Sequence, residues 1–94
     1  MDYENSVVIT GKMHFLKGQT EGVTGTGKYM QFAVRQDSEW ENGTRRDFLI
    51  IRAYDESLRN QILAINEGDD VKVEGTLRSS RGSGVNYVRC QSVK

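Results

Sequence analysis

Two stretches of the chain carry aromatic and arginine side chains at alternate positions. In residues 29–35 apolar residues alternate with larger or charged ones, which is typical of a half-buried β-strand. Residues 48–54 also predict a strand, which is apolar on both faces apart from Arg52. The side chains expected on their outward face are Tyr29, Arg35, Phe48, Ile50, Arg52 and Tyr54, and the connection between them adds Trp40, Arg45 and Arg46. Flat rings stack on other rings, and guanidinium groups bind anions and also stack. This face therefore suits a ligand that has both flat rings and negative charge.

The rest of the chain predicts three further strands and one helix. Alternating apolar residues indicate strands near residues 7–11, 71–77 and 85–93. Between residues 56 and 66 the apolar positions, which are Leu58, Ile62, Leu63 and Ile65, fall on one helical face. Asp55 is suited to begin this helix and Gly68 to end it. Asn42-Gly43 favours a tight turn, so the strands on either side of it should pair antiparallel.

This order of elements predicts an all-β fold. Three strands, one short helix and two strands is the chain order of an oligonucleotide/oligosaccharide-binding (OB) barrel. An SH3-like barrel would lack the helix, and a ferredoxin-like fold would need two. The 94 residues leave room for only one domain, so residues 1–94 are expected to form a single five-stranded OB domain.

Composition excludes several classes of protein. Lysine and arginine number 13, as do aspartate and glutamate, and the single cysteine, Cys90, allows no intrachain disulfide. No apolar run approaches the ~18 residues of a membrane helix, and no signal peptide is visible at the start, so a location in the cytoplasm and no membrane partner are expected. Gly22–Tyr29 resembles a phosphate-binding loop but lacks the Ser or Thr after its lysine. We expect no catalytic site, no cofactor and no metal.

Unpaired nucleic acid fits the predicted face. Successive bases stack on aromatic side chains with about 1–3 kcal/mol each, whereas duplex DNA hides its base faces. In this fold the loops between strands also contact the ligand, and here two glycine-rich loops, Gly22–Lys28 and Ser79–Gly84, carry Lys28 and Arg81 and are expected to be flexible. A single outward aromatic residue is explained equally well by packing under a loop or against another subunit. Several of them beside arginines favour binding, and zero net charge predicts a shallow salt dependence.

Three segments resemble one protein family. Gln31–Trp40 (QFAVRQDSEW), Asp47–Tyr54 (DFLIIRAY) and Glu67–Arg78 (EGDDVKVEGTLR) are similar to the second, third and fourth strands of bacterial and phage single-stranded-DNA-binding proteins. The resemblance extends from Asn5 to Val93. It implies base stacking on Trp40, Phe48 and Tyr54. It also implies backbone contacts from Arg35, Arg45, Arg46, Arg52 and Arg78, and pairing of subunits through Ser6–Gly11 into a homodimer or homotetramer.

The chain also departs from this family. It ends at Lys94 without the acidic-tipped tail through which the cellular proteins recruit partners. We therefore expect either a trimmed chain or a short member similar to the tail-less, dimeric primosomal replication protein N group. Two functions therefore stay open. The first is binding of single-stranded DNA with little sequence preference in replication, recombination, repair or restart, with replication or recombination proteins as further partners. The second is a protein-interaction module of a replication complex with weak or no DNA binding. Stacking alone does not separate DNA from RNA.

Overall fold

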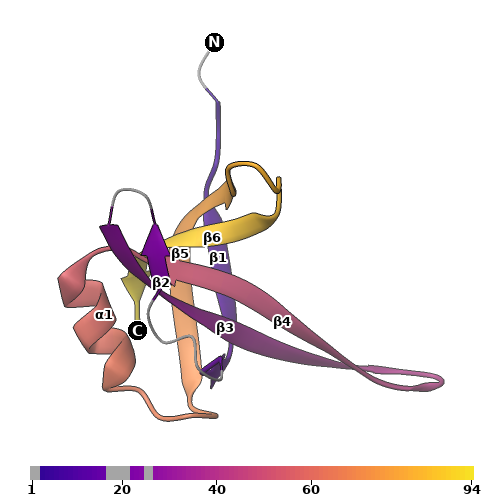
Figure 1. Ribbon diagram of the computed structural model, residues 1–94. Helices are drawn as coiled ribbons and strands as arrows, with labels where there is room; N and C mark the ends of the chain where they lie inside the picture. Colours follow the sequence, from indigo (N-terminus) through magenta and orange to yellow (C-terminus); the bar gives the residue numbers. More distant parts are fainter. Residues whose placement is uncertain (1–2, 17–21, 25–26) are drawn as a thin grey trace.

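The structure, a computed structural model, describes residues 3–16, 22–24 and 27–94. The elements in chain order are β1 (Val7–His14), β2 (Gly22–Thr24), β3 (Gly27–Trp40), β4 (Gly43–Ala53), α1 (Glu56–Leu63), β5 (Asp70–Ser79) and β6 (Asn86–Val93) (Figure 1). The predicted helix between the third and fourth long strands is present. No helix in the described ranges has the length and apolar character needed to cross a membrane.

The long strands close into a ring because β1 pairs on both of its edges. Residues Val7–Lys12 pair antiparallel with β5, and Lys12–His14 pair antiparallel with β3. β3 then pairs with β4, and β5 with β6, both antiparallel, while β4 and β6 meet in a short parallel pairing. The ring order β1-β3-β4-β6-β5 is that of an OB barrel, so the predicted fold class is confirmed.

The inward side chains of the ring form one apolar core. Phe32 on β3, Ile51 on β4 and Val73 on β5 are fully buried, and Ile62 of α1 packs against them at one end of the ring. Cys90 is also buried, as its alternation with Val88 predicts, and burial raises the pKa of its thiol to about 11. Since the core occupies the inner face of the long strands, their alternate side chains lie on the outer face of the ring.

Helix α1 begins where the sequence predicts and ends earlier. The Asp55 carboxylate accepts a hydrogen bond from the Ser57 backbone N–H at 2.9 Å, and this bond is the main cause that lowers the pKa of Asp55. The helix ends at Leu63 rather than near Asn66, because Ala64 and Ile65 donate to carbonyls three residues back, which tightens the last turn. Gly68 follows with a positive φ of 85°.

Within the glycine-rich segment 22–28, the described residues 22–24 and 27–28 differ from their prediction as a loop. Gly22–Thr24 form β2, which pairs antiparallel with Gly27–Tyr29 at the start of β3. β1 covers β3 only at Ala33–Arg35, so the first residues of β3 present a free edge that a second strand can pair with. The other predicted loop is a hydrogen-bonded turn, in which Ser80 N–H donates to Val85 C=O at 2.8 Å.

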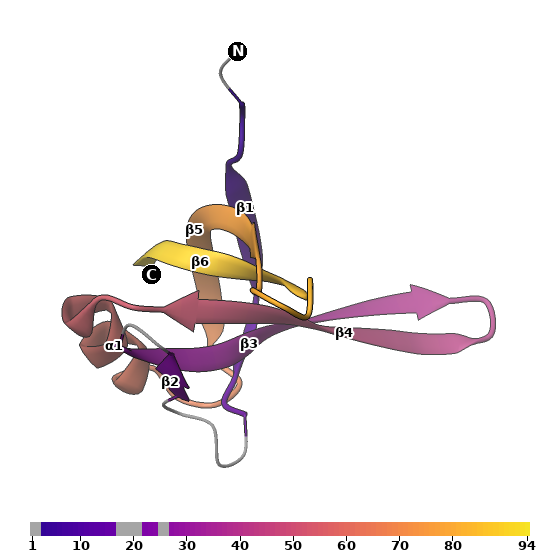
Figure 2. The ribbon, with the colours of Figure 1, turned by 45° about the horizontal axis from the view of Figure 1, so that its top comes forward.

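Strands β3 and β4 extend beyond the ring as a two-stranded arm (Figures 1 and 2). Their antiparallel register runs without interruption from Met30 opposite Ala53 to Trp40 opposite Gly43. The predicted antiparallel pairing is therefore confirmed. The turn itself consists of Glu41 and Asn42, and Gly43 supplies the positive φ of 135° at its end.

Gly75 allows β5 and β6 to approach each other at a bulge. The register shifts between Glu74 and Gly75, and a Cβ atom on Gly75 would lie 2.0 Å from the carbonyl oxygen of Arg89. Because that neighbour is backbone, it cannot move without breaking the β5–β6 pairing. A side chain at this position is therefore incompatible with the closed ring.

We predict that Gly75→Ala lowers the free energy of unfolding by more than about 3 kcal/mol, since overpacking against backbone cannot be relieved by a rotamer change. Gly84→Ala is the matched control, because its φ of 70° costs about 1–2 kcal/mol while nothing lies within 4 Å of the new Cβ. Urea denaturation of both variants measures the difference. Equal losses would contradict the assigned role of Gly75.

Candidate nucleic-acid interface

The register of the sheet decides which side chains share the outward face. Arg35 lies opposite Phe48 and Gln31 opposite Arg52 across the β3–β4 pair, and Arg52 lies opposite Arg89 across β4–β6. Paired residues point to the same side of a sheet. The structure therefore places one set of side chains together on the outward face of β3, β4 and β6. That set is Tyr29, Arg35, Phe48, Ile50, Arg52, Tyr54, Tyr87 and Arg89.

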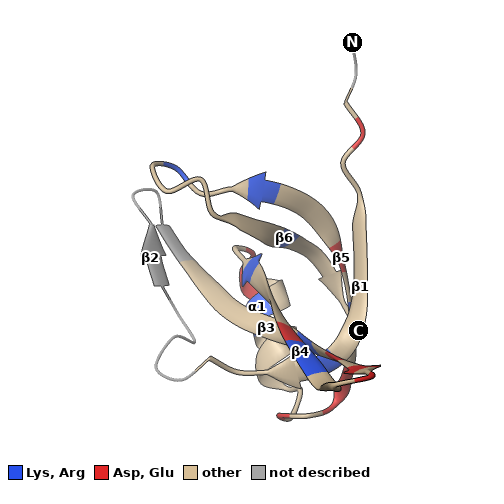
Figure 3. Ribbon diagram, turned by 90° about the vertical axis from the view of Figure 1, so that its right-hand side faces the viewer, with Lys and Arg blue, Asp and Glu red and all other residues tan. Residues whose placement is uncertain are grey.

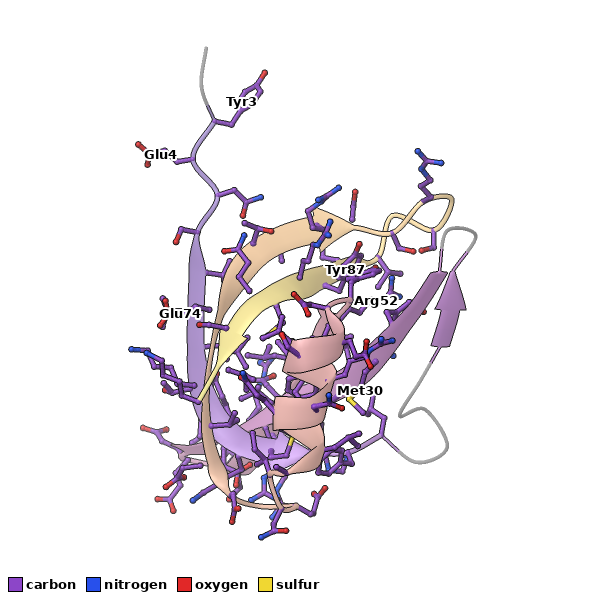
Figure 4. The ribbon with its side chains drawn as sticks, turned by 90° about the vertical axis from the view of Figure 1, so that its left-hand side faces the viewer. Tyr3, Glu4, Met30, Arg52, Glu74 and Tyr87 are labelled. Carbon is purple, nitrogen blue, oxygen red and sulfur yellow. The ribbon has the colours of Figure 1, made fainter. Side chains whose placement is uncertain are left out.

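Tyr29, Arg52, Tyr54, Tyr87 and Arg89 form one continuous group, here called the tyrosine–arginine ladder. The Arg52 guanidinium carbon lies 4.7 Å from the Tyr29 ring centroid and 4.2 Å from that of Tyr87. The Tyr29 and Tyr54 centroids are 5.4 Å apart, and the Arg89 guanidinium lies 5.0 Å from the Tyr54 ring. Figure 4 shows Arg52 and Tyr87 side by side. Rings and cations thus alternate across three strands.

The ladder is ordered by its own contacts. Arg52 Nε donates to Gln31 Oε1 at 2.9 Å, and the Tyr54 hydroxyl contacts that of Tyr87 at 3.4 Å. Partial burial, followed by the contact with Tyr87, raises the pKa of Tyr54. The Tyr54 ring is therefore neutral at physiological pH. Since its side chains are already held in place, the ladder loses little rotamer entropy when a ligand binds.

Phe48 forms a second aromatic site further along β4. Its side chain is exposed, and its ring centroid lies 5.0 Å from that of His14 at the end of β1. His14 Nδ1 is 2.9 Å from Glu67 Oε2, and the other Glu67 oxygen accepts the Phe15 backbone N–H at 2.8 Å. His14 thus lies at the end of β1 between Phe48 and Glu67.

Trp40 lies apart from this outward face. It is 64% exposed near the end of the arm, opposite Gly43. Ser38, two residues before Trp40, lies opposite Arg45, so Trp40 and Arg45 share one side of the arm. Phe48 is three residues from Arg45 on the same strand, so it points to the other side. The structure therefore does not bring Trp40 together with Phe48 and Tyr54 on one pleated face. Trp40, Asn42, Gly43, Thr44 and Arg45 line a small depression of about 240 Å³.

The arginines of the arm lie close to carboxylates, and two of the three arginines share one carboxylate. Nε atoms of Arg35 and Arg46 lie 3.4 and 3.6 Å from Asp37 Oδ1. Arg45 Nε lies 3.2 Å from Asp47 Oδ1. Figure 3 shows acidic and basic positions side by side along the arm. A phosphate that reached these arginines would have to compete with the carboxylates.

The remaining predicted cations lie at the other end of the sheet. Arg78 is opposite Tyr87 on the outward face of β5, and Arg81 is exposed in the turn before β6. The side chain of Lys28, also predicted, lies outside the described residues. No group of three or more potential metal ligands occurs within the described part of the chain.

Sequence reasoning missed Tyr87 and Arg89 as site residues. Both lie on β6, which the prediction used only for the core. The signal was present, because Tyr87 and Arg89 alternate with the buried Val88 and Cys90 and must point outward. What the sequence could not show is that β6 lies parallel to β4, directly beside Arg52.

We predict that Glu67→Gln lowers the free energy of unfolding at pH 7 by less than about 1 kcal/mol, because the carboxylate is exposed. The Phe15 backbone N–H, followed by His14, lowers the pKa of Glu67 below its ordinary 4.5. The charged form is thus favoured in the folded state, and its contribution is lost as the pH falls below about 4.5. Urea denaturation of the wild type and of Glu67→Gln at pH 7 and pH 3 tests this. An equal difference in the free energy of unfolding at both pH values would contradict it.

No protein-family model and no curated protein sequence matches the chain. Solved structures do match over nearly its whole length. The mitochondrial single-stranded-DNA-binding protein Rim1 from S. cerevisiae has a TM-score of 0.76 at 16% identity, covering 99% of this chain and 95% of its own. The single-stranded-DNA-binding protein of Plasmodium falciparum, solved with single-stranded DNA, has a TM-score of 0.70 at 14% identity, with coverages of 100% and 94%.

The dimeric N-terminal domain of PriB from Thermoanaerobacter tencongensis is also similar. Its TM-score is 0.64 at 22% identity, and the match covers 96% of this chain and 93% of that domain. At these identities the comparisons establish architecture rather than activity. The chain therefore has the fold of the single-stranded-DNA-binding proteins that its sequence resembles.

Proposed function

We propose that this protein binds single-stranded DNA with little sequence preference. The observation that carries the proposal is the outward face of β3, β4 and β6, where Phe48, Tyr54 and Tyr87 lie among arginines. Exposed rings offer surfaces on which unpaired bases stack, and every base has a π-face, so stacking does not read sequence. The fold shared with the Plasmodium protein, which was solved with single-stranded DNA, supports the same function.

In this proposal, base stacking contributes more to the affinity for single-stranded DNA than charge does. The protein has a formal net charge of zero, and the arginines of the arm are paired with Asp37 and Asp47. Along the arm, few phosphates can then be neutralised without breaking an ion pair, so affinity should fall only slowly as salt increases. The proposed role is to hold or protect the strand during replication, recombination, repair or restart in the cytoplasm, not to catalyse a reaction.

We also propose that two or four copies assemble through the first strand. β3 covers β1 only at Lys12–His14, which leaves residues Val7–Gly11 with one edge unpaired by another strand of the described chain. Val8 on this strand is 59% exposed. An open edge beside an exposed apolar side chain favours pairing with a second copy. The similar PriB domain is dimeric, which supports this proposal.

We predict that Phe48→Ala and Tyr54→Ala each weaken binding of oligo-dT by about 1–3 kcal/mol. Fluorescence anisotropy of a labelled oligonucleotide at two salt concentrations measures the affinity. Leu63→Ala, which removes an exposed apolar side chain of α1, is the control and should bind as the wild type does. Unchanged affinity in both aromatic variants would show that the bases stack elsewhere.

The role of Trp40 is tested separately, because it is the single tryptophan of the chain. Its intrinsic fluorescence should be quenched as oligo-dT binds if the strand also reaches the arm. Binding without quenching would remove Trp40 from the interface and leave the outward face intact. Absence of any binding at tens of micromolar protein would instead favour the protein-interaction module.

We predict that Val8→Glu shifts the mass in solution from dimer or tetramer to monomer. The new carboxylates would face each other across the paired first strands, and like charges in close opposition are destabilising. Light scattering after size-exclusion chromatography measures the mass, with Leu63→Glu as the control for an added surface charge. A mass that stays oligomeric in Val8→Glu would place the interface elsewhere.

A further inference from the structure

A polar groove continues the outward face beyond the end of β4. β4 and β6 pair only at Ile51–Val88 and Arg52–Arg89, after which the chain leaves the sheet and enters α1. The space that opens between α1, β5 and β6 is a groove of about 550 Å³. It is lined by Tyr54, Asp55, Leu58, Thr76, Arg78, Arg89, Cys90 and Gln91.

The cations of this groove differ from those of the arm. Within the described ranges, neither Arg78 nor Arg89 makes an ion pair with a carboxylate. The one acidic residue that lines the groove is Asp55, whose Oδ1 accepts from the backbone N–H and hydroxyl of Ser57. Two unpaired guanidinium groups thus outweigh one hydrogen-bonded carboxylate, and the groove is suited to an anion.

We propose that this groove binds the sugar–phosphate backbone of single-stranded nucleic acid, next to the nucleotide that stacks on Tyr54. The inference rests on the proposed function and adds to it the path that the nucleic-acid strand follows over the protein. The strand would follow β4 from Phe48 to Tyr54, a distance of about 20 Å at the usual rise per residue, and then enter the groove. It would not need to follow the arm, where the arginines are already paired.

Nucleic acid explains the groove better than an acidic peptide does. Arg89 lies 5.0 Å from the ring of Tyr54, so one side chain of the groove is part of the tyrosine–arginine ladder. A ligand that places a flat ring on the ladder and an anion in the groove uses both features at once. Thr76 and Gln91 add a hydroxyl and an amide that can bond to phosphate or sugar oxygens. A chain of carboxylates would leave the rings unused.

The test compares charge removal in the groove with charge removal elsewhere. The double variant Arg78→Gln/Arg89→Gln is the groove variant. Lys72→Gln, at an exposed position nearer the start of β5, removes one charge and is the matched control for the single variant Arg78→Gln. The probes are labelled oligo-dT and an abasic oligomer with the same number of phosphates. For the groove variant we expect about tenfold weaker binding of oligo-dT, and a salt slope smaller by about 1.4, which corresponds to two lost phosphate contacts.

The abasic oligomer isolates the phosphate contacts. The wild type should bind the abasic oligomer more weakly than oligo-dT. The groove variant should lose this binding, whereas Phe48→Ala and Lys72→Gln should retain it. If the double variant does not fold, the single variant Arg78→Gln, at an exposed position, still tests the groove. It should reduce the salt slope of oligo-dT binding by about 0.7. Circular dichroism establishes that each variant is folded.

Failure of this inference is distinct from failure of the proposed function. If the wild type binds oligo-dT and the folded groove variants bind it with the same affinity and salt slope, the groove is not used although the function stands. If oligoglutamate of equal length competes as well as oligo-dT, the groove binds an acidic peptide and the inference is overturned. If the wild type binds neither oligo-dT nor the abasic oligomer, the proposed function fails and the groove assignment fails with it.

Discussion

The alternation of side chains along strands that close into a ring is the constraint on which the rest of the structure depends. Once β1 pairs with both β3 and β5, the inward side chains within the ring form the core, and the alternate residues of β3, β4 and β6 lie on the outward face. Phe48, Tyr54 and Tyr87 are exposed or half-exposed for this reason, not because the core lacks space. The aromatic face is thus a geometric consequence of closure, and Gly75 permits that closure where β5 approaches β6.

The charges of the outward face are divided between its two ends. At the arm, Asp37 lies close to both Arg35 and Arg46, while Arg52 is held between tyrosine rings and Arg78 and Arg89 border the groove. A protein with zero net charge can still present a local anion site, because the compensating carboxylates are placed elsewhere. This division explains how a neutral domain can bind a polyanion with modest dependence on salt.

Much of the fold was predictable from the sequence, and less of the site. Period-two patterns located the long strands and the Leu58–Ile62 face located the helix, because burial imposes these spacings directly. The short strand β2 escaped prediction, since it depends on the free edge that β3 presents. The position of Arg89 beside Arg52 depends on a parallel pairing between strands far apart in sequence. The ion pairs of Arg35 and Arg46 with Asp37 follow from the register of the arm. The opposite orientation of Trp40 follows from the alternation that continues along β3 from the buried Val34.

Photo-cross-linking to an oligonucleotide that contains 5-iodouracil, followed by mass spectrometry, tests the central claim most directly. If unpaired bases lie on the outward face of β3, β4 and β6, the cross-linked residues are Phe48, Tyr54 or Tyr87. Cross-links confined to Tyr3 at the start of the chain, which Figure 4 shows away from the sheet, or to α1 would contradict the account.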